Sequence, residues 1–214
     1  MKLEKIEQTG SSTNRLLLVF SDETRLKAPP FVAADLDLFP GKELTEDEMQ
    51  TLRAAVAKAL TRERAVRSIA ASALSEKELS RRLVQKGASE SDAQETVDWL
   101  RELRLLDDAQ TARQLALSAA GRGYGAARIK NILYEKGIPR ELWDEALADL
   151  PAPDGAIDQF LRQRLDGRTA DDRTVKKAVD ALMRRGHSWR DIQAGLRRYR
   201  DGLELEMDGL EEME

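Results

Sequence analysis

Two adjacent carboxylates, Asp107 and Asp108, are the side chains of this sequence best suited to chemistry. A carboxylate pair can hold a divalent metal ion or divide the roles of general acid and general base. The pair also precedes a helical pattern, and aspartate is among the residues favoured at a helix N-cap. We therefore interpret the pair as a helix cap and not as a catalytic or metal site.

The segment from Gly121 to Gly125 has the glycine content of a phosphate-binding loop. No strand pattern precedes it and no Gly-Lys-Ser/Thr follows it, so it fits neither the dinucleotide-binding nor the P-loop pattern. Cysteine is absent and His187 is the only histidine, which excludes thiol nucleophiles, disulfides and Cys/His zinc sites. We expect His187 to be structural. We expect no catalytic, cofactor-binding or metal-binding residues and no enzymatic activity.

A pattern of helically spaced apolar residues that ends in a basic residue and a glycine occurs three times, at a period close to fifty residues. The copies are Leu79-Leu83-Lys86-Gly87, Ile129-Leu133-Lys136-Gly137 and Ala178-Leu182-Arg185-Gly186. Each glycine suits the left-handed conformation at a helix end. Twelve residues earlier stand three acceptable N-caps, Ser75, Gly125 and Thr174. Each copy holds roughly three short helices, which bury a good core only when neighbouring copies stack.

The sequence predicts an all-α protein of three tandem three-helix repeats in an elongated array, preceded by a small N-terminal β-hairpin. The hairpin follows from the apolar run 15–20 between two turn-forming segments. Thr45 and Glu48 match a capping box, so a long helix begins there. We place the boundaries at 1–44 for the hairpin and its connection, 45–106 for the leading helix and repeat 1, 107–150 for repeat 2, 151–200 for repeat 3, and 201–214 for an acidic, disordered tail.

The formal net charge of −4 hides an uneven distribution of charge. Residues 151–200 carry twelve basic and seven acidic side chains, and residues 201–214 carry seven acidic and no basic ones. Solvation of helix faces explains such charges, but a basic repeat next to an acidic tail also suits an anionic partner that displaces the tail. The candidates for contact with a protein partner or DNA are Arg81, Arg82, Lys86, Arg128, Lys130, Lys136, Lys176, Lys177, Arg184, Arg185 and Trp189. For Trp99 and Trp189, partner contact and packing between repeats are both open.

Three stretches resemble the bacterial RecX family of regulatory proteins. They are Ser75-Glu76-Lys77-Glu78-Leu79, Leu105-Leu106-Asp107-Asp108, and Gly125-Ala126-Ala127-Arg128-Ile129-Lys130 running to Glu135-Lys136-Gly137-Ile138. The resemblance is strongest over residues 60–150 and extends in pattern to residue 200. It implies three tandem three-helix repeats, no enzymatic activity, and binding to the RecA recombinase filament that restrains strand exchange and ATP hydrolysis.

Two functions are compatible with these patterns. The first is a non-catalytic regulator that binds the RecA–DNA filament and inhibits the recombinase in DNA repair and recombination, with contact to single- or double-stranded DNA. The alternative is a direct nucleic-acid-binding regulator built of three-helix modules, without a recombinase partner; both need a basic surface. No apolar run reaches the length of a membrane span and the N-terminus lacks a signal-peptide core, so we expect a cytoplasmic monomer without a cofactor.

Overall fold

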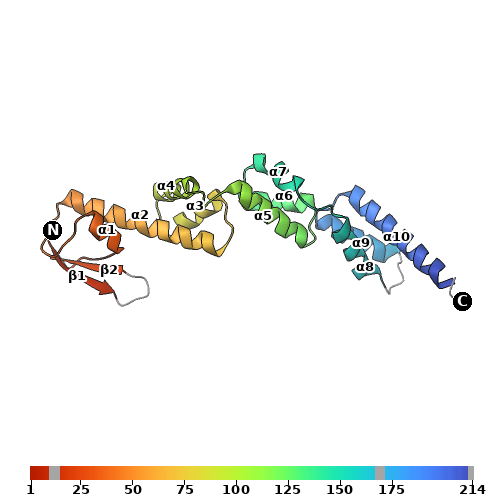
Figure 1. Cartoon of the computed structure of the whole chain (residues 1–214), viewed down its shortest axis with the longest axis horizontal. Helices are drawn as coiled ribbons and strands as arrows, with labels where there is room; N and C mark the ends of the chain where they lie inside the picture. Colours follow the sequence, from red (N-terminus) through yellow and green to blue (C-terminus); the bar gives the residue numbers. More distant parts are fainter. Residues whose placement is uncertain (10–14, 167–171, 212–214) are drawn as a thin grey trace. The chain divides into compact units, whose positions relative to one another are not determined.

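The computed structural model describes residues 1–9, 15–166 and 172–211 (Figure 1). The chain divides into two compact units. The first unit comprises Met1–Ser72 and Glu78–Leu106, and the second comprises Ala73–Lys77 and Asp107–Glu214. A small antiparallel sheet and a set of helices make up the described chain, which confirms the predicted fold class. None of the helices in these ranges has the length and apolar content needed to cross a membrane.

A three-stranded sheet opens the first unit, with strands β1 (Leu3–Thr9), β2 (Arg15–Phe20) and β3 (Arg25–Ala28) in sequential order. It contains the expected hairpin and adds β3, whose residues pair with β2 in antiparallel register. Leu18 and Phe20 of β2 pack in one core with Met49 and Leu52 of helix α2 (Glu46–Ala71), and helix α1 (Pro30–Asp35) adds Val32 to it. The sheet is thus stabilised by the helix that leads into the repeats.

The predicted capping box starts α2. Thr45 Oγ1 accepts a hydrogen bond from the Glu48 amide at 3.2 Å, and Glu48 Oε2 accepts one from the Thr45 amide at 2.8 Å. The helix then runs without glycine or proline to Ala71. These residues are mostly strong helix formers, which explains its length.

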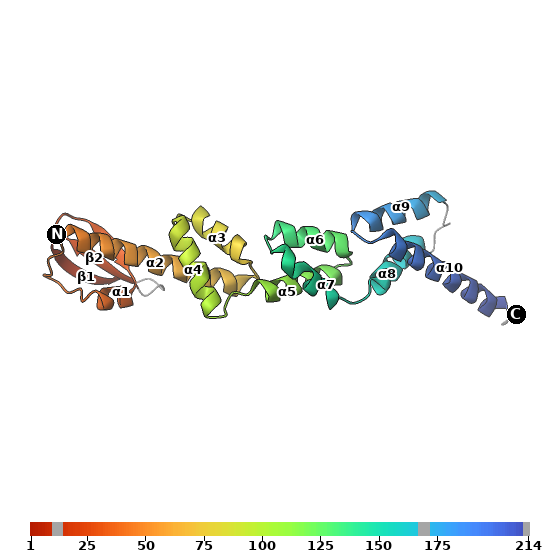
Figure 2. The same ribbon diagram turned by 90° about the horizontal axis from the view of Figure 1, so that it is seen from above.

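Helices α3 (Glu76–Gln85) and α4 (Glu90–Glu102) form the first repeat with the C-terminal part of α2 (Figure 2). From Glu78 on they belong to the first unit. The core between them buries the predicted apolar positions Leu79, Leu83, Val97 and Leu100. Ser89 Oγ accepts from the Asp92 amide at 3.0 Å, so the side chain of Ser89 determines where α4 begins.

The second repeat consists of α5 (Asp108–Gly121), α6 (Ala126–Glu135), a 3₁₀ turn (Arg140–Leu142) and α7 (Trp143–Ala148). Small residues of α5, such as Ala112 and Ala116, pack against Ile129 and Leu133 of α6. Because alanine side chains are short, the helices approach closely. The helix end at Gly137 has φ of 74°, as the repeat pattern predicted.

The third repeat consists of α8 (Asp154–Leu165), α9 (Asp172–Arg184) and α10 (Trp189–Glu211). Ile157 and Leu161 of α8 pack with Leu182 of α9 and Ile192 of α10. The backbone of α10 continues helically to Glu211, through most of the segment that we expect to be disordered from residue 201. Residues 212–214 of that segment lie outside the described residues.

Two joints within the second unit use equivalent positions of the repeat. In the first, which we call the Ser75 joint, Ser75 Oγ donates a hydrogen bond to the carbonyl of Lys136. In the second, the Gly125 joint, the Gly125 amide donates to the carbonyl of Arg185 at 2.9 Å. Each acceptor is the basic residue before a helix-ending glycine, and each donor is the N-cap position of the preceding repeat. The predicted repeat register therefore also aligns the contacts between copies.

Candidate interaction surface

The basic residues predicted to face a partner in the first repeat differ in their surroundings. Arg81 and Lys86 are exposed. Arg82 is half-buried, and its Nη2 lies 2.6 Å from Glu78 Oε1 on the same helix. The Lys86 carbonyl accepts a hydrogen bond from Arg64 Nη1 at 3.2 Å, which ties the end of α3 to α2. Arg82 therefore offers less free charge than its two neighbours.

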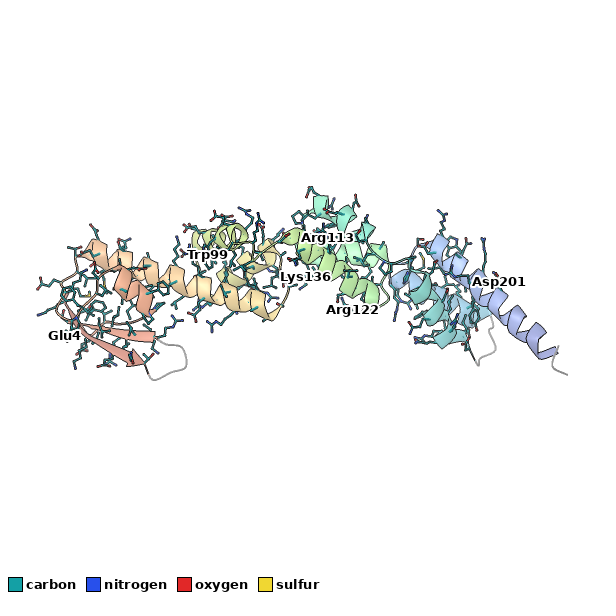
Figure 3. All side chains as sticks on the ribbon, viewed as in Figure 1. Glu4, Trp99, Arg113, Arg122, Lys136 and Asp201 are labelled. Atoms are coloured by element: carbon teal, nitrogen blue, oxygen red, sulfur yellow. The ribbon has the colours of Figure 1, made fainter. Side chains whose placement is uncertain are left out.

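The cations of the second repeat face carboxylates. Arg128 Nη1 lies 3.3 Å from Glu135 Oε1, Lys130 Nζ lies 3.7 Å from Asp144 Oδ1, and Arg113, labelled in Figure 3, pairs with Glu145. Lys136, also labelled there, is half-buried and supplies the carbonyl of the Ser75 joint. Exposed ion pairs add little stability, but they neutralise the charge that a phosphate would otherwise meet. The second repeat is accordingly a weak candidate for binding an anion.

The third repeat keeps its basic charge at the surface. Lys176, Lys177 and Arg184 are exposed on α9, and none of them has a carboxylate within 4.0 Å among the residues that the structure describes. Arg185 behaves differently, because its guanidinium lies 4.8 Å from the centre of the Phe160 ring and the side chain is half-buried. Three of these four predicted residues are therefore available to an anionic partner, and Arg185 has a packing role.

A second basic surface, which the sequence patterns did not single out, lies on α10. We call it the α10 stripe, and it is made of Trp189, Arg190, Gln193, Arg197 and Arg200, all of them exposed. On a helix with 3.6 residues per turn these positions share one arc of about 100°. Arg190 and Arg197 have no basic counterpart at the equivalent positions of the other repeats, and Arg200 has one only in the first repeat, so the comparison of repeats passed over this surface. Their helical spacing alone was the signal.

Trp99 and Trp189, for which packing and partner contact were both left open, have different surroundings in the structure. Trp99, labelled in Figure 3, is half-buried, and the guanidinium of Arg62 on α2 lies 4.6 Å from its ring centre. Its observed contact is thus packing inside the first repeat, and not the packing between repeats that was one of the two predictions. Trp189 is 53% exposed at the first turn of α10. Contact between Trp189 and a partner therefore stays a prediction.

The carboxylate pair acts as two caps. Asp107 Oδ1 accepts from the amides of Ala109 and Gln110 at 2.8 and 3.0 Å, which confirms it as the N-cap of α5. Asp108 Oδ1 accepts from the Glu76 amide at 2.8 Å, at the first residue of α3. Burial raises the pKa of Asp108, against the opposing effect of that hydrogen bond. No group of three or more potential metal ligands occurs in the described parts of the chain.

His187 lies at a helix joint, as predicted. Its ring is buried, and Nε2 is 3.1 Å from the carbonyl oxygen of Gly123. Because a carbonyl only accepts, Nε2 carries the proton, and Nδ1 is then a buried acceptor without a partner among the described residues. Burial lowers the pKa of His187. The side chain is suited to holding the Gly125 joint together in its neutral form.

Comparison with known proteins gives one consistent family. Models of the first and second three-helix domains of RecX match residues 62–100 and 107–147. The regulatory protein RecX of Cronobacter sakazakii is 33% identical over 151 residues, which is 64% of this chain and 90% of that protein. The regulatory protein RecX of Escherichia coli is 32% identical over 166 residues, which is 72% of this chain and 99% of that protein.

Solved structures show the same fold. The crystal structure of a regulatory protein RecX aligns with 94% of this chain and 98% of its own, at a TM-score of 0.66 and 20% identity. The crystal structure of RecX from Lactobacillus salivarius aligns with 67% of this chain and 97% of its own, at a TM-score of 0.58 and 18% identity. The N-terminal sheet and the three repeats thus have close structural precedents.

Proposed function

The chain belongs to the RecX family of regulatory proteins, and from that premise we propose that it is a non-catalytic regulator that binds the RecA–DNA filament and inhibits the recombinase. Both relatives described above are named regulatory protein RecX, and the alignments cover nearly their whole lengths. Tandem repeats stack into extended surfaces suited to large partners, such as a filament. The catalytic alternatives lose support because the carboxylate pair and the single histidine are both engaged in structural contacts.

The observation that carries this proposal is that Lys176, Lys177 and Arg184 of α9 have no carboxylate partner among the described residues. A filament that contains DNA presents phosphate, and a protein that neutralises phosphates gains affinity by releasing counterions. Lys176, Lys177 and Arg184 can do so without first breaking an ion pair with another described residue. The paired cations of the second repeat would have to give up a carboxylate. The acidic segment from residue 201 would compete with the filament for the basic surface of the free protein.

The test measures affinity for the recombinase filament on single-stranded DNA, for the same DNA alone, and for the recombinase alone, across a salt series. We expect the filament to be bound most tightly and its ATP hydrolysis to fall as the protein is added. Replacing Lys176, Lys177 and Arg184 with alanine should weaken filament binding and flatten its salt dependence. Arg185 is left intact because it packs on Phe160.

A matched variant removes the same charge from paired positions, with alanine at Arg113, Arg128 and Lys130. It should lose less affinity than the α9 variant, because those cations already face carboxylates. Deleting residues 201–214 should tighten binding at low salt, and less so at high salt, where screening is stronger. Equal affinity for the filament and for its DNA alone would contradict the proposal and support the direct nucleic-acid-binding regulator.

A further inference from the structure

The α10 stripe is a surface of unusual composition. Trp189, Arg190, Gln193, Arg197 and Arg200 are exposed along one side of the helix, while Ile192 is buried in the core on the other side. At 1.5 Å per residue, Arg190 and Arg200 are about 15 Å apart along the axis. The α10 stripe therefore presents an aromatic ring, an amide and three guanidinium groups over about three helical turns.

Three carboxylates near the stripe, those of Asp154, Asp158 and Asp191, have partners outside it. Asp158 is bound by Arg198, whose Nη2 lies 2.8 Å from Oδ1, and Arg198 also pairs with Asp154. Asp191 Oδ2 accepts from Ser188 Oγ at 2.6 Å, as part of the cap of α10. Among the described residues no carboxylate lies within ion-pair distance of any arginine of the α10 stripe. The stripe thus presents its charge outward, in contrast to the paired cations of the second repeat.

The side chains of the α10 stripe limit what can bind to it. Three arginines favour an anionic partner, and the guanidinium group matches the geometry of phosphate well. The exposed indole ring beside them can stack on a planar group such as a nucleic-acid base. Bases that are paired inside a duplex already stack on each other and are not available for this contact. A membrane surface would require more apolar side chains than one tryptophan. The combination favours an extended, phosphate-bearing chain with unstacked bases.

We propose that the α10 stripe binds single-stranded nucleic acid, with Arg190, Arg197 and Arg200 on successive phosphates and Trp189 stacked on a base. The interaction belongs to the free chain and needs no recombinase, so it goes beyond the filament regulation proposed above. The N-terminal end of a helix also favours negative charge, which places the first phosphate near Trp189 and Arg190. The tryptophan gives the contact its preference for single strands, and the arginines give it affinity.

The experiment measures binding of fluorescein-labelled oligo(dT) to the full-length protein by anisotropy, without recombinase and across a salt series. We expect the variant with alanine at Arg190, Arg197 and Arg200 to reduce the slope of log K against log salt by about 2, since each phosphate contact to a single strand contributes about 0.7. Trp189→Leu should weaken binding about fivefold or more through loss of stacking. It should also remove most of the quenching of tryptophan fluorescence by oligo(dT).

Control variants distinguish binding by the α10 stripe from a nonspecific effect of net charge. The variant with alanine at Arg113, Arg128 and Lys130 loses the same charge and should keep most of the salt slope. All substituted side chains of the α10 stripe are exposed, so thermal melting should match that of the parent chain. Trp189→Phe keeps an aromatic ring and should bind more tightly than Trp189→Leu.

The outcomes decide the proposal independently of filament binding. It is overturned if oligo(dT) does not bind, if the second-repeat variant loses as much slope as the α10 variant, or if Trp189→Leu binds normally. Equal affinity for duplex and single strand that is insensitive to Trp189 would assign the stripe to duplex phosphates and also overturn it. If the parent chain fails to bind oligo(dT) but still binds the filament, the proposal for the α10 stripe fails and the proposed filament regulation stands.

Discussion

The Ser75 joint and the Gly125 joint make the same connection with different groups. Both end on the carbonyl of a basic residue just before a helix-ending glycine, Lys136 in one and Arg185 in the other. Ser75 reaches its carbonyl with a side-chain hydroxyl, whereas Gly125 uses its own backbone amide. A hydroxyl extends the reach of the donor, so the Ser75 joint leaves room between the backbones. The Gly125 joint brings the backbones into direct contact.

This difference shows how a repeat can keep a contact while its sequence changes. In the Gly125 joint the Ala127 amide adds a hydrogen bond to the Gly186 carbonyl at 3.2 Å, so two backbone segments lie against each other. A Cβ atom on Gly125 would overlap the backbone of Gly186. In the Ser75 joint a Cβ on Gly137 would meet only the side chain of Lys77. We therefore expect the Gly125 joint to be the less tolerant of substitution.

The largest expected effect is that of Gly125→Ala. The added methyl group has no space between the two backbones, and relieving the overlap should cost about 3 kcal/mol of the free energy of unfolding. Urea denaturation followed by circular dichroism measures it. Gly121→Ala is the matched control, because a Cβ there meets nothing within 4 Å. If both variants unfold alike, the close approach in the Gly125 joint is wrong.

A smaller loss is expected for Gly137→Val in the Ser75 joint. Gly137 has φ of 74°, a conformation that costs a residue with a Cβ about 1–2 kcal/mol, and β-branching adds to the strain. The Lys77 stem is flexible and can move aside. Thermal melting against Gly155→Ala, a glycine with open space around it, isolates the backbone contribution. A loss as large as that of Gly125→Ala would remove the distinction between the joints.

Sequence patterns predicted the parts of this fold that depend on local chemistry. The helix end at Gly137, the Asp107 cap and the Thr45 capping box all follow from residues within one turn of the helix end that they determine. Strand β3 was missed because it is only four residues long and carries Arg25 and Lys27, which break the apolar pattern. Short, charged strands are typical of sheet edges and give a weak signal.

Contacts between distant residues could not be predicted in the same way. Gly125 fits the position of an N-cap, and nothing near it in sequence indicates that Gly186 lies against it. Asp108 was assigned to a cap with Asp107, but it caps a different helix, thirty-two residues earlier in the chain. The arginines of the α10 stripe were missed for another reason. The repeat pattern reports what the copies share, and a surface present in a single copy is invisible to it.

The Ser75 joint can be weakened without strain by Ser75→Ala. The change removes the hydroxyl that donates to the Lys136 carbonyl, and the expected loss is about 1 kcal/mol, the net value of a typical hydrogen bond. Chemical denaturation of the variant is compared with that of Ser118→Ala, an exposed serine. A loss near zero would mean that water replaces the hydroxyl and that the joint is held by the Asp108–Glu76 contact instead.

The smallest expected effect is the response of the Gly125 joint to acid through His187. In the unfolded chain a histidine has its ordinary pKa of 6.5, and burial lowers the pKa of His187 in the folded chain. The nearby charges oppose each other, since Asp191 raises the pKa and Arg185 lowers it. As the pH falls, the unfolded chain therefore binds the proton first. The stability that depends on neutral His187 is complete above pH 6.5 and is lost progressively below it, until the folded form is protonated as well.

Protonation has a structural cost in this joint. Nε2 already donates to the Gly123 carbonyl, so the second proton must go to Nδ1, which is buried without a partner among the described residues. Melting temperatures of the parent chain and of His187→Gln, measured between pH 7.5 and 5.0, give the comparison. The parent chain should lose stability relative to the glutamine variant as the pH falls, because glutamine does not titrate and its amide can still donate to Gly123. Parallel curves would show that His187 keeps an ordinary pKa and that the Gly125 joint rests on its backbone contacts alone.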